Sequence, residues 1–201
     1  MAARKGTKAP GDTLYVPNRG AWREWLKENH DMRNDIWLIY PKKHTGRPRI
    51  PYADAVEEAL CFGWIDSTAK GIDEDTFAQR FSRRKRKGVF SQANIERVRR
   101  LIRLVKMTPA GLAVIGNPEA LEPGKKLVIA PDILGALRED PQVWANFQKF
   151  PEIYKRIRIA YIEGGRRHGE EAFQRRLRNF VRKTEANRQF GFGGVQTEEG
   201  M

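Results

Sequence analysis

The chain of 201 residues has few of the side chains that form disulfides or bind metal ions: it contains one cysteine, Cys61, and three histidines. One cysteine cannot form a disulfide within the chain, and one cysteine with three scattered histidines excludes the usual zinc sites. Cys61 lies among apolar residues, so we expect it to be a small core residue rather than a nucleophile. From these residue types we predict no catalytic residue and no metal site.

Long apolar runs are also lacking. No segment approaches the roughly 20 apolar residues that cross a membrane as a helix. The first residues, "MAARKGTKAPGD", contain no apolar stretch of signal-peptide length. We therefore expect a cytoplasmic protein without a transmembrane segment, whose residues 1–10 form a disordered basic tail.

Positive charge is abundant, with a formal net charge of +13. Residues 80–106 carry eleven Lys or Arg and one acidic residue, and residues 155–188 carry eleven and four. Such an uneven distribution favours a polyanionic partner, which we expect to be nucleic acid or another polyanion. Two alternatives stay open: charge that serves solubility alone, and attraction to an anionic membrane surface. The oligomeric state is not readable from the sequence.

The first half of the chain alternates between helical and strand patterns, which predicts an α+β domain over residues 11–107 with a small, mainly antiparallel sheet and flanking helices. Asn18 is a plausible helix N-cap, and Pro51 stands at the first position of a second helix. The predicted strands are 12–17, 34–43, 63–72 and 76–84, and the predicted helices are 18–30, 51–62 and 91–107.

The second half reads as helices. Thr108 and Pro109 open a helix, two prolines and two glycines then mark a linker to residue 130, and a helical module follows over 131–190 with a flexible tail over 191–201. The apolar stripes that we predict for its helices, and for the helix at 91–107, are Ile95, Val98, Leu101, Ile102 and Val105; Ile153, Ile157, Ala160 and Tyr161; and Phe173, Leu177, Phe180 and Val181.

Several motifs resemble one known family. They are "VEEALCFGWIDS", "DEDTFAQRFSRRK" and "SQANIERVRRLIRLVKMTPAGLAVI", followed by "FPEIYKRIRIAYIEGG" and "FQRRLRNFVRKTEANRQFGF". Over roughly residues 12–192 the chain is similar to the YdeI/OmpD-associated (bacteriocin-protection) family. It departs from that pattern at Arg83, where a proline is usual, and at Phe90 and Phe192, where a tryptophan is common. The resemblance implies a protection function, no established reaction and no cofactor, and it suggests a porin partner only weakly.

Two groups of residues are candidate sites. The motif residues Trp64, Asp66, Arg80, Phe81 and Ser82 form the first, either as a small-molecule or enzymatic pocket around Trp64, Asp66 and Arg80, or as a core with an Asp66–Arg80 ion pair across the hairpin. The acids at Asp73 to Asp75 are expected to be turn residues rather than a cation site.

The second group is a basic face for anions, because Lys and Arg bind phosphates and release counterions. Its predicted members are Arg83, Arg84, Lys85, Arg86, Lys87, Arg97, Arg100, Arg103, Arg175, Arg176 and Arg182. Our leading hypothesis is a non-enzymatic stress- or bacteriocin-protection protein that binds nucleic acid or another polyanion through this face.

Overall fold

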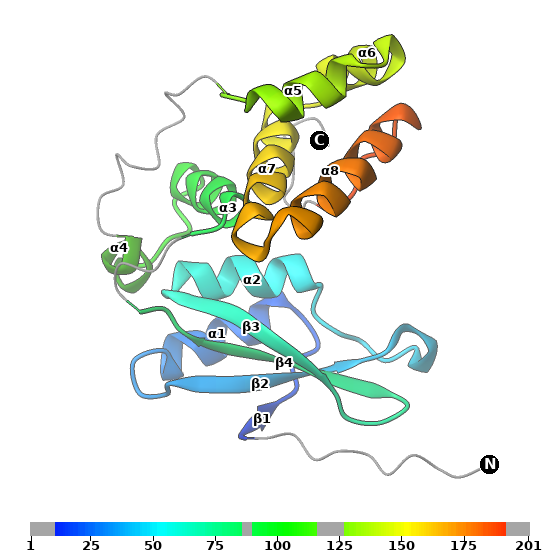
Figure 1. The fold of residues 1–201 in the computed structure, drawn as a ribbon. Helices are drawn as coiled ribbons and strands as arrows, with labels where there is room; N and C mark the ends of the chain where they lie inside the picture. The colour runs from blue at the N-terminus through cyan, green and yellow to red at the C-terminus, as the bar shows by residue number, and fades with distance from the viewer. Residues whose placement is uncertain (1–10, 86–89, 116–126, 192–201) are drawn as a thin grey trace, which may run out of the picture. The chain divides into compact units, whose positions relative to one another are not determined.

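The computed structural model describes residues 11–85, 90–115 and 127–191, and the chain divides into two compact units. The first unit contains the described residues 11–85 and 98–115, and the second contains 90–97 and 127–191 (Figure 1). The α+β class is confirmed: a small sheet with helices is followed by a helical region. The predicted tail 1–10, residues 116–126 of the predicted linker and the tail from residue 192 lie outside the described residues, and the domain boundaries stay predictions.

The sheet of the first unit has four strands in the order β1-β2-β4-β3. Strands β2, β4 and β3 pair in antiparallel fashion, and the short β1 runs parallel to β2. The apolar, β-branched pattern of "DIWLIYP" produces the buried β2, and the "DEDT" turn joins β3 to β4 as predicted. The strands are β1 (Thr13–Leu14), β2 (Asp35–Pro41), β3 (Trp64–Gly71) and β4 (Thr76–Arg83).

Helices α1 (Arg19–Asn29) and α2 (Tyr52–Cys61) pack on one face of this sheet, with the short helix η1 (Lys43–Thr45) between β2 and α2. Asn18 caps α1 as predicted, since its Oδ1 accepts the Ala21 N–H at 3.0 Å. Trp22 of α1 meets the Phe81 ring of β4 edge-on, with 5.4 Å between centroids. Pro51 is the N-cap of α2 rather than its first residue.

Helix α3 (Gln92–Arg103) begins in the second unit and ends in the first. Ser91 caps it, with its Oγ 3.3 Å from the Asn94 nitrogen. The helix ends before the predicted stripe does: Val105 adopts a positive φ of 53° and is 89% exposed. Val105 is therefore not a core residue, whereas Val98 and Leu101 are fully buried as predicted.

Helix α4 (Pro109–Ile115) packs against the end of α2. Thr108 caps it: its hydroxyl donates to the Cys61 carbonyl at 2.6 Å and lies 3.3 Å from the Gly111 nitrogen. Gly111 faces the same carbonyl so closely that a Cβ there would lie 2.2 Å from the oxygen. The turn from α2 into β3 and the start of α4 thus form one packed junction, with Cys61 buried in it.

The second unit is helical, with one apolar core. Its elements are α5 (Pro131–Arg138), α6 (Pro141–Lys149), α7 (Glu152–Glu163), η3 (Arg166–His168) and α8 (Glu170–Glu185). The core residues are Ile133, Leu137, Val143, Phe147, Phe150, Tyr154, Ile159, Ile162, Phe173, Leu177 and Phe180. The predicted stripe of α8 is confirmed, with Val181 half-buried at its edge.

The buried side of α7 differs from the prediction. Ala160 and Tyr161 are exposed, while Tyr154 and Ile162 are completely buried. The buried side is therefore turned by about one residue from the predicted stripe, and the Tyr154 hydroxyl is satisfied inside the core by the Phe190 N–H at 3.2 Å. This rotation leaves Tyr161 available at the surface. Within the described ranges, no helix is both long and apolar enough to cross a membrane.

Candidate anion-binding site

The residues of the first predicted site lie on two faces of the sheet. In the β3–β4 pair Asp66 stands opposite Phe81, and Ile65 stands opposite Ser82. Directly opposed residues share a face and neighbours along a strand alternate, so Asp66 and Phe81 face the helices while Arg80 and Ser82 face away. The pocket around Trp64, Asp66 and Arg80 is therefore not formed as one cavity.

The predicted Asp66–Arg80 ion pair is wrong. Arg80 instead binds Asp35 on β2, where Nε lies 2.9 Å from Oδ2 and Nη2 contacts the same oxygen. Asp66 accepts the hydroxyl of Tyr52 at the start of α2, at 2.5 Å. Trp64 is fully buried, and its Nε1 donates to the His30 carbonyl at 3.1 Å. These contacts hold strands and helices together.

The acidic residues at the hairpin tip are turn residues, as predicted. Asp73 Oδ1 accepts the backbone N–H groups of Asp75 and Thr76 at 2.8 and 2.6 Å, and the Thr76 hydroxyl at 2.9 Å. The bond from the Thr76 side chain, then those from the backbone, lower the pKa of Asp73. In the described part of the chain, no three Cys, His, Asp or Glu side chains form a cluster that would hold a metal ion.

The basic residues at 83–87 are less uniformly exposed than the sequence pattern predicts. Arg83 and Lys85 are exposed, Arg84 is half-buried with its pKa lowered by burial, and Arg86 and Lys87 lie outside the described residues. On α3, Arg103 is exposed.

The remaining arginines predicted on the α3 face have partners within the protein. Arg97 is only 4% exposed, and its Nη1 donates to Asn94 Oδ1 at 2.8 Å. Arg100 pairs with Glu57 at 3.0 Å. The sequence pattern overestimated this face because it counted arginines that stabilise the fold.

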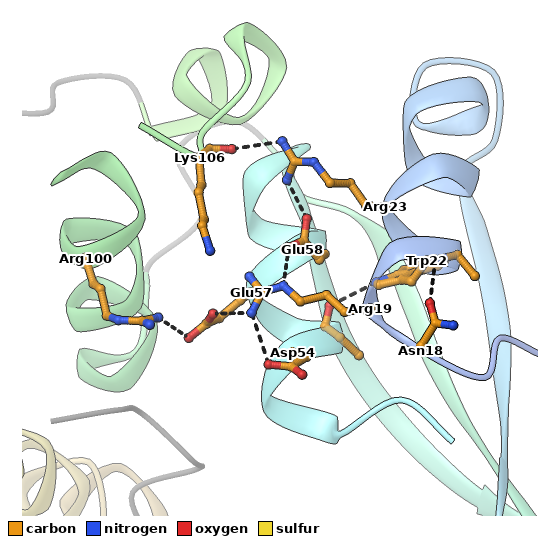
Figure 2. Close-up of polar contacts among 11 residues, drawn as sticks. Asn18, Arg19, Trp22, Arg23, Asp54, Glu57, Glu58, Arg100 and Lys106 are labelled. Atoms are coloured by element: carbon orange, nitrogen blue, oxygen red, sulfur yellow. Dashed lines mark hydrogen bonds and ion pairs between the residues drawn. The ribbon is translucent and has the colours of Figure 1, made fainter. Parts of the chain in front are cut away.

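A buried ion network, which sequence reasoning missed, joins α1 to α2 (Figure 2). Glu57 and Glu58 of α2 are each 2% exposed. Arg19 Nε and Arg23 Nη1 each lie 2.5 Å from a Glu58 oxygen, and Arg23 also donates to the Lys106 carbonyl at 3.3 Å. The missed signal was the i, i+4 spacing of Arg19 and Arg23 on one helix beside two adjacent glutamates on the next. Because the charges neutralise one another, this network is a structural element.

A basic hollow opens on α8 in the second unit, with a volume of about 510 Å³. We call it the α8 hollow. Among the residues that the structure describes, Tyr161 of α7 is the one aromatic residue in its lining. The lining residues are Tyr161, Arg175, Arg176, Arg178, Asn179 and Arg182. Three of these, Arg175, Arg176 and Arg182, were predicted from the sequence as anion-binding residues, and the structure brings them together.

The arginines of the α8 hollow have little negative charge near them. Among the described residues, the lining arginines have one carboxylate within 4.0 Å, Glu171, which lies 3.9 Å from Arg175. Arg176 donates to the Tyr161 carbonyl at 2.7 Å, and Arg182 to the Asn179 side-chain oxygen at 3.3 Å. Neutral acceptors hold these guanidinium groups in place without cancelling their charge.

Arg158 adds a further positive charge next to the Tyr161 ring. Its guanidinium carbon lies 4.8 Å from the Tyr161 ring centroid, and that of Arg176 lies 4.3 Å from the same centroid. Arg158 is 2% exposed, and its Nε and Nη2 have no hydrogen-bond partner among the described residues. Burial lowers the pKa of Arg158, and the charge of Arg176 lowers it further. An anion near this site would relieve the repulsion.

Two family models match the chain. Residues 14–114 match a model described as Domain of unknown function (DUF8412), and residues 126–187 match the model described as Bacteriocin-protection, YdeI or OmpD-Associated. The second match covers the helices of the α8 hollow, a shorter stretch than the resemblance over 12–192 that the motifs predict. No curated protein and no solved structure matches the chain. The chain therefore belongs to the DUF8412 family, and its C-terminal helices are similar to the YdeI or OmpD-associated, bacteriocin-protection family.

Proposed function

We propose that this protein is a non-enzymatic, cytosolic protection protein of the stress or bacteriocin type, which binds nucleic acid or another polyanion through the α8 hollow. The observation that supports this most strongly is that four arginines line the hollow and that, among the described residues, one carboxylate, that of Glu171, pairs with them. The match of residues 126–187 to the bacteriocin-protection family supports the protection role in this proposal.

The chemistry of the hollow suits phosphate groups. Guanidinium groups donate paired hydrogen bonds to phosphate oxygens, and each contact releases counterions from the polyanion. Arg175, Arg178 and Arg182 are exposed at positions i, i+3 and i+7 of α8, so they form a row along one side of the helix. A row of exposed arginines fits a chain of phosphates better than a single small anion.

An electrophoretic mobility shift at low salt tests this proposal. We expect the protein to shift a labelled oligonucleotide, and the variant Arg175→Gln/Arg178→Gln/Arg182→Gln to bind at least tenfold more weakly. The matched control is Lys27→Gln/Lys43→Gln/Arg47→Gln, which removes three exposed positive charges from the first unit and so lowers the net charge equally. We expect the control to bind like the wild type.

Two results would overturn the proposal. One is the absence of any shift with DNA, RNA or heparin at low salt. The other is an equal loss of binding in both triple variants, which would mean that net charge alone drives association. Flotation with anionic lipid vesicles, in the absence of oligonucleotide binding, would assign the basic surface to a membrane instead.

A further inference from the structure

We infer that the α8 hollow selects single-stranded over double-stranded nucleic acid, an inference that rests on the proposed function above. The hollow combines groups for three parts of a nucleotide: arginines for the phosphate, a ring and a guanidinium plane for the base face, and an amide for the base edge. Only an unpaired strand presents all three parts at once.

The size of the hollow favours one strand. Its volume of about 510 Å³ falls within the roughly 300–1,000 Å³ typical of small-ligand sites, so it has room for one nucleotide rather than for both strands of a duplex. A duplex would touch only the exposed arginines at the rim, Arg175, Arg178 and Arg182. A duplex would form ion pairs with these arginines but would not contact Tyr161 or Asn179.

Tyr161 and Arg176 offer a surface for stacking. Tyr161 is 48% exposed, and the guanidinium carbon of Arg176 lies 4.3 Å from its ring centroid. Nucleobases stack on aromatic rings and on guanidinium planes, and such contacts tolerate any base. The buried Arg158, 4.8 Å from the same centroid, adds positive charge next to this ring.

Asn179 supplies the group for the base edge. Its side-chain oxygen accepts a bond from Arg182 at 3.3 Å, which leaves its NH₂ group without a hydrogen-bond partner among the described residues. An amide NH₂ donates to acceptors on the Watson–Crick edge of a base, an edge that is open in a single strand and occupied in a paired one. Asn179 and Tyr161 together therefore distinguish the two forms, while the rim arginines do not.

Competition measured by fluorescence anisotropy tests the inference. A labelled single strand of mixed sequence is bound first, and unlabelled single strand, duplex and heparin are then added at equal numbers of negative charges. We expect the single strand to compete at least tenfold more effectively than the duplex. The variant Tyr161→Leu/Asn179→Ala should lose at least fivefold in affinity for the single strand and keep its affinity for the duplex.

Tyr15→Leu is the matched control, since Tyr15 is also a partly exposed tyrosine beside an arginine and lies in the first unit. It should keep the single-strand preference. Equal competition by single strand and duplex, or an equal loss of both in the Tyr161→Leu/Asn179→Ala variant, overturns this inference and leaves the polyanion proposal standing. Failure of the wild type to bind any of the three competitors overturns both.

Discussion

Arg80 shows how a single step along a strand decides which partner a side chain meets. It stands opposite Trp37 on β2 and faces away from the helices, on the side where Asp35 lies. Asp66 stands opposite Phe81, one residue further along β4, and therefore faces α2. The hairpin itself was predictable from local alternation, but its register was not, because the register also depends on the pairing of β4 with β2.

A double-mutant cycle in urea denaturation tests this register. Arg80→Gln and Asp35→Asn should show a coupling free energy of about 0.3–1 kcal/mol, as expected for a half-exposed ion pair. Arg80→Gln and Asp66→Asn should be additive within about 0.3 kcal/mol. Coupling in the second pair and additivity in the first would mean that β3 and β4 pair in another register.

Cys61 provides a second test at the scale of single residues. Burial, and then the Glu58 carboxylate, raise the pKa of its thiol to about 11. A raised pKa means that the neutral thiol stabilises the fold below the ordinary thiol pKa, and that this contribution is lost as the pH rises towards 11. At pH 8 we expect the native protein to react with a thiolate-specific disulfide reagent at least a hundredfold more slowly than free cysteine. Full reactivity should return in denaturant, and rapid reaction of the native protein would show that the site is open.

At the scale of elements, the association of α1 with α2 depends on charges that the sequence pattern hid. A helix with two glutamates in its middle is ordinarily read as solvent-exposed on that side, yet Glu57 and Glu58 are buried with Ala55 and Val56. Their burial follows from Arg19 and Arg23, which approach from a separate helix. Such pairing is a property of packing, so the periodicity of α2 alone does not reveal it.

Glu58→Gln should therefore destabilise the first unit. The change removes charged hydrogen bonds to Arg19 and Arg23, but both arginines are partly exposed and Arg19 keeps other carboxylate partners, so we expect a loss of about 1–3 kcal/mol. Glu24→Gln is the matched control: Glu24 is exposed, and its contact with Lys27 at 3.8 Å is weak. Urea denaturation compares them. A loss for Glu58→Gln no larger than that of the control would show that the network adds nothing to stability.

The junction of α2 and α4 gives a second prediction at this scale. Gly111→Ala places a Cβ 2.2 Å from the Cys61 carbonyl oxygen, so α4 has to move away from α2. We expect the free energy of unfolding to fall by about 1–3 kcal/mol, as for other overpacked sites. Gly71→Ala is the control, because no atom lies within 4 Å of its new Cβ, and it should stay within about 0.5 kcal/mol of wild type. Similar melting temperatures for both variants would contradict the packing described for α4.

For the whole molecule, the class of fold and the concentration of positive charge in α8 were readable from the sequence, because both follow from local composition and periodicity. The α8 hollow was only partly readable. Arg175, Arg176 and Arg182 were predicted, but the stripe of α7 was misjudged, so Tyr161 was expected in the core. Arg158 was not singled out from the sequence, and tertiary packing buries it. Sequence periodicity failed for side chains whose burial depends on contacts with other helices.

The salt dependence of oligonucleotide binding tests the polyanion function of the α8 hollow most directly. For single strands, each phosphate contact contributes about 0.7 to the slope of log K against log salt concentration. The Arg175→Gln/Arg178→Gln/Arg182→Gln variant should therefore show a slope smaller in magnitude by about 2 than wild type. The Lys27→Gln/Lys43→Gln/Arg47→Gln control should keep the wild-type slope. Identical slopes for wild type and the α8 variant would show that these arginines do not contact the polyanion.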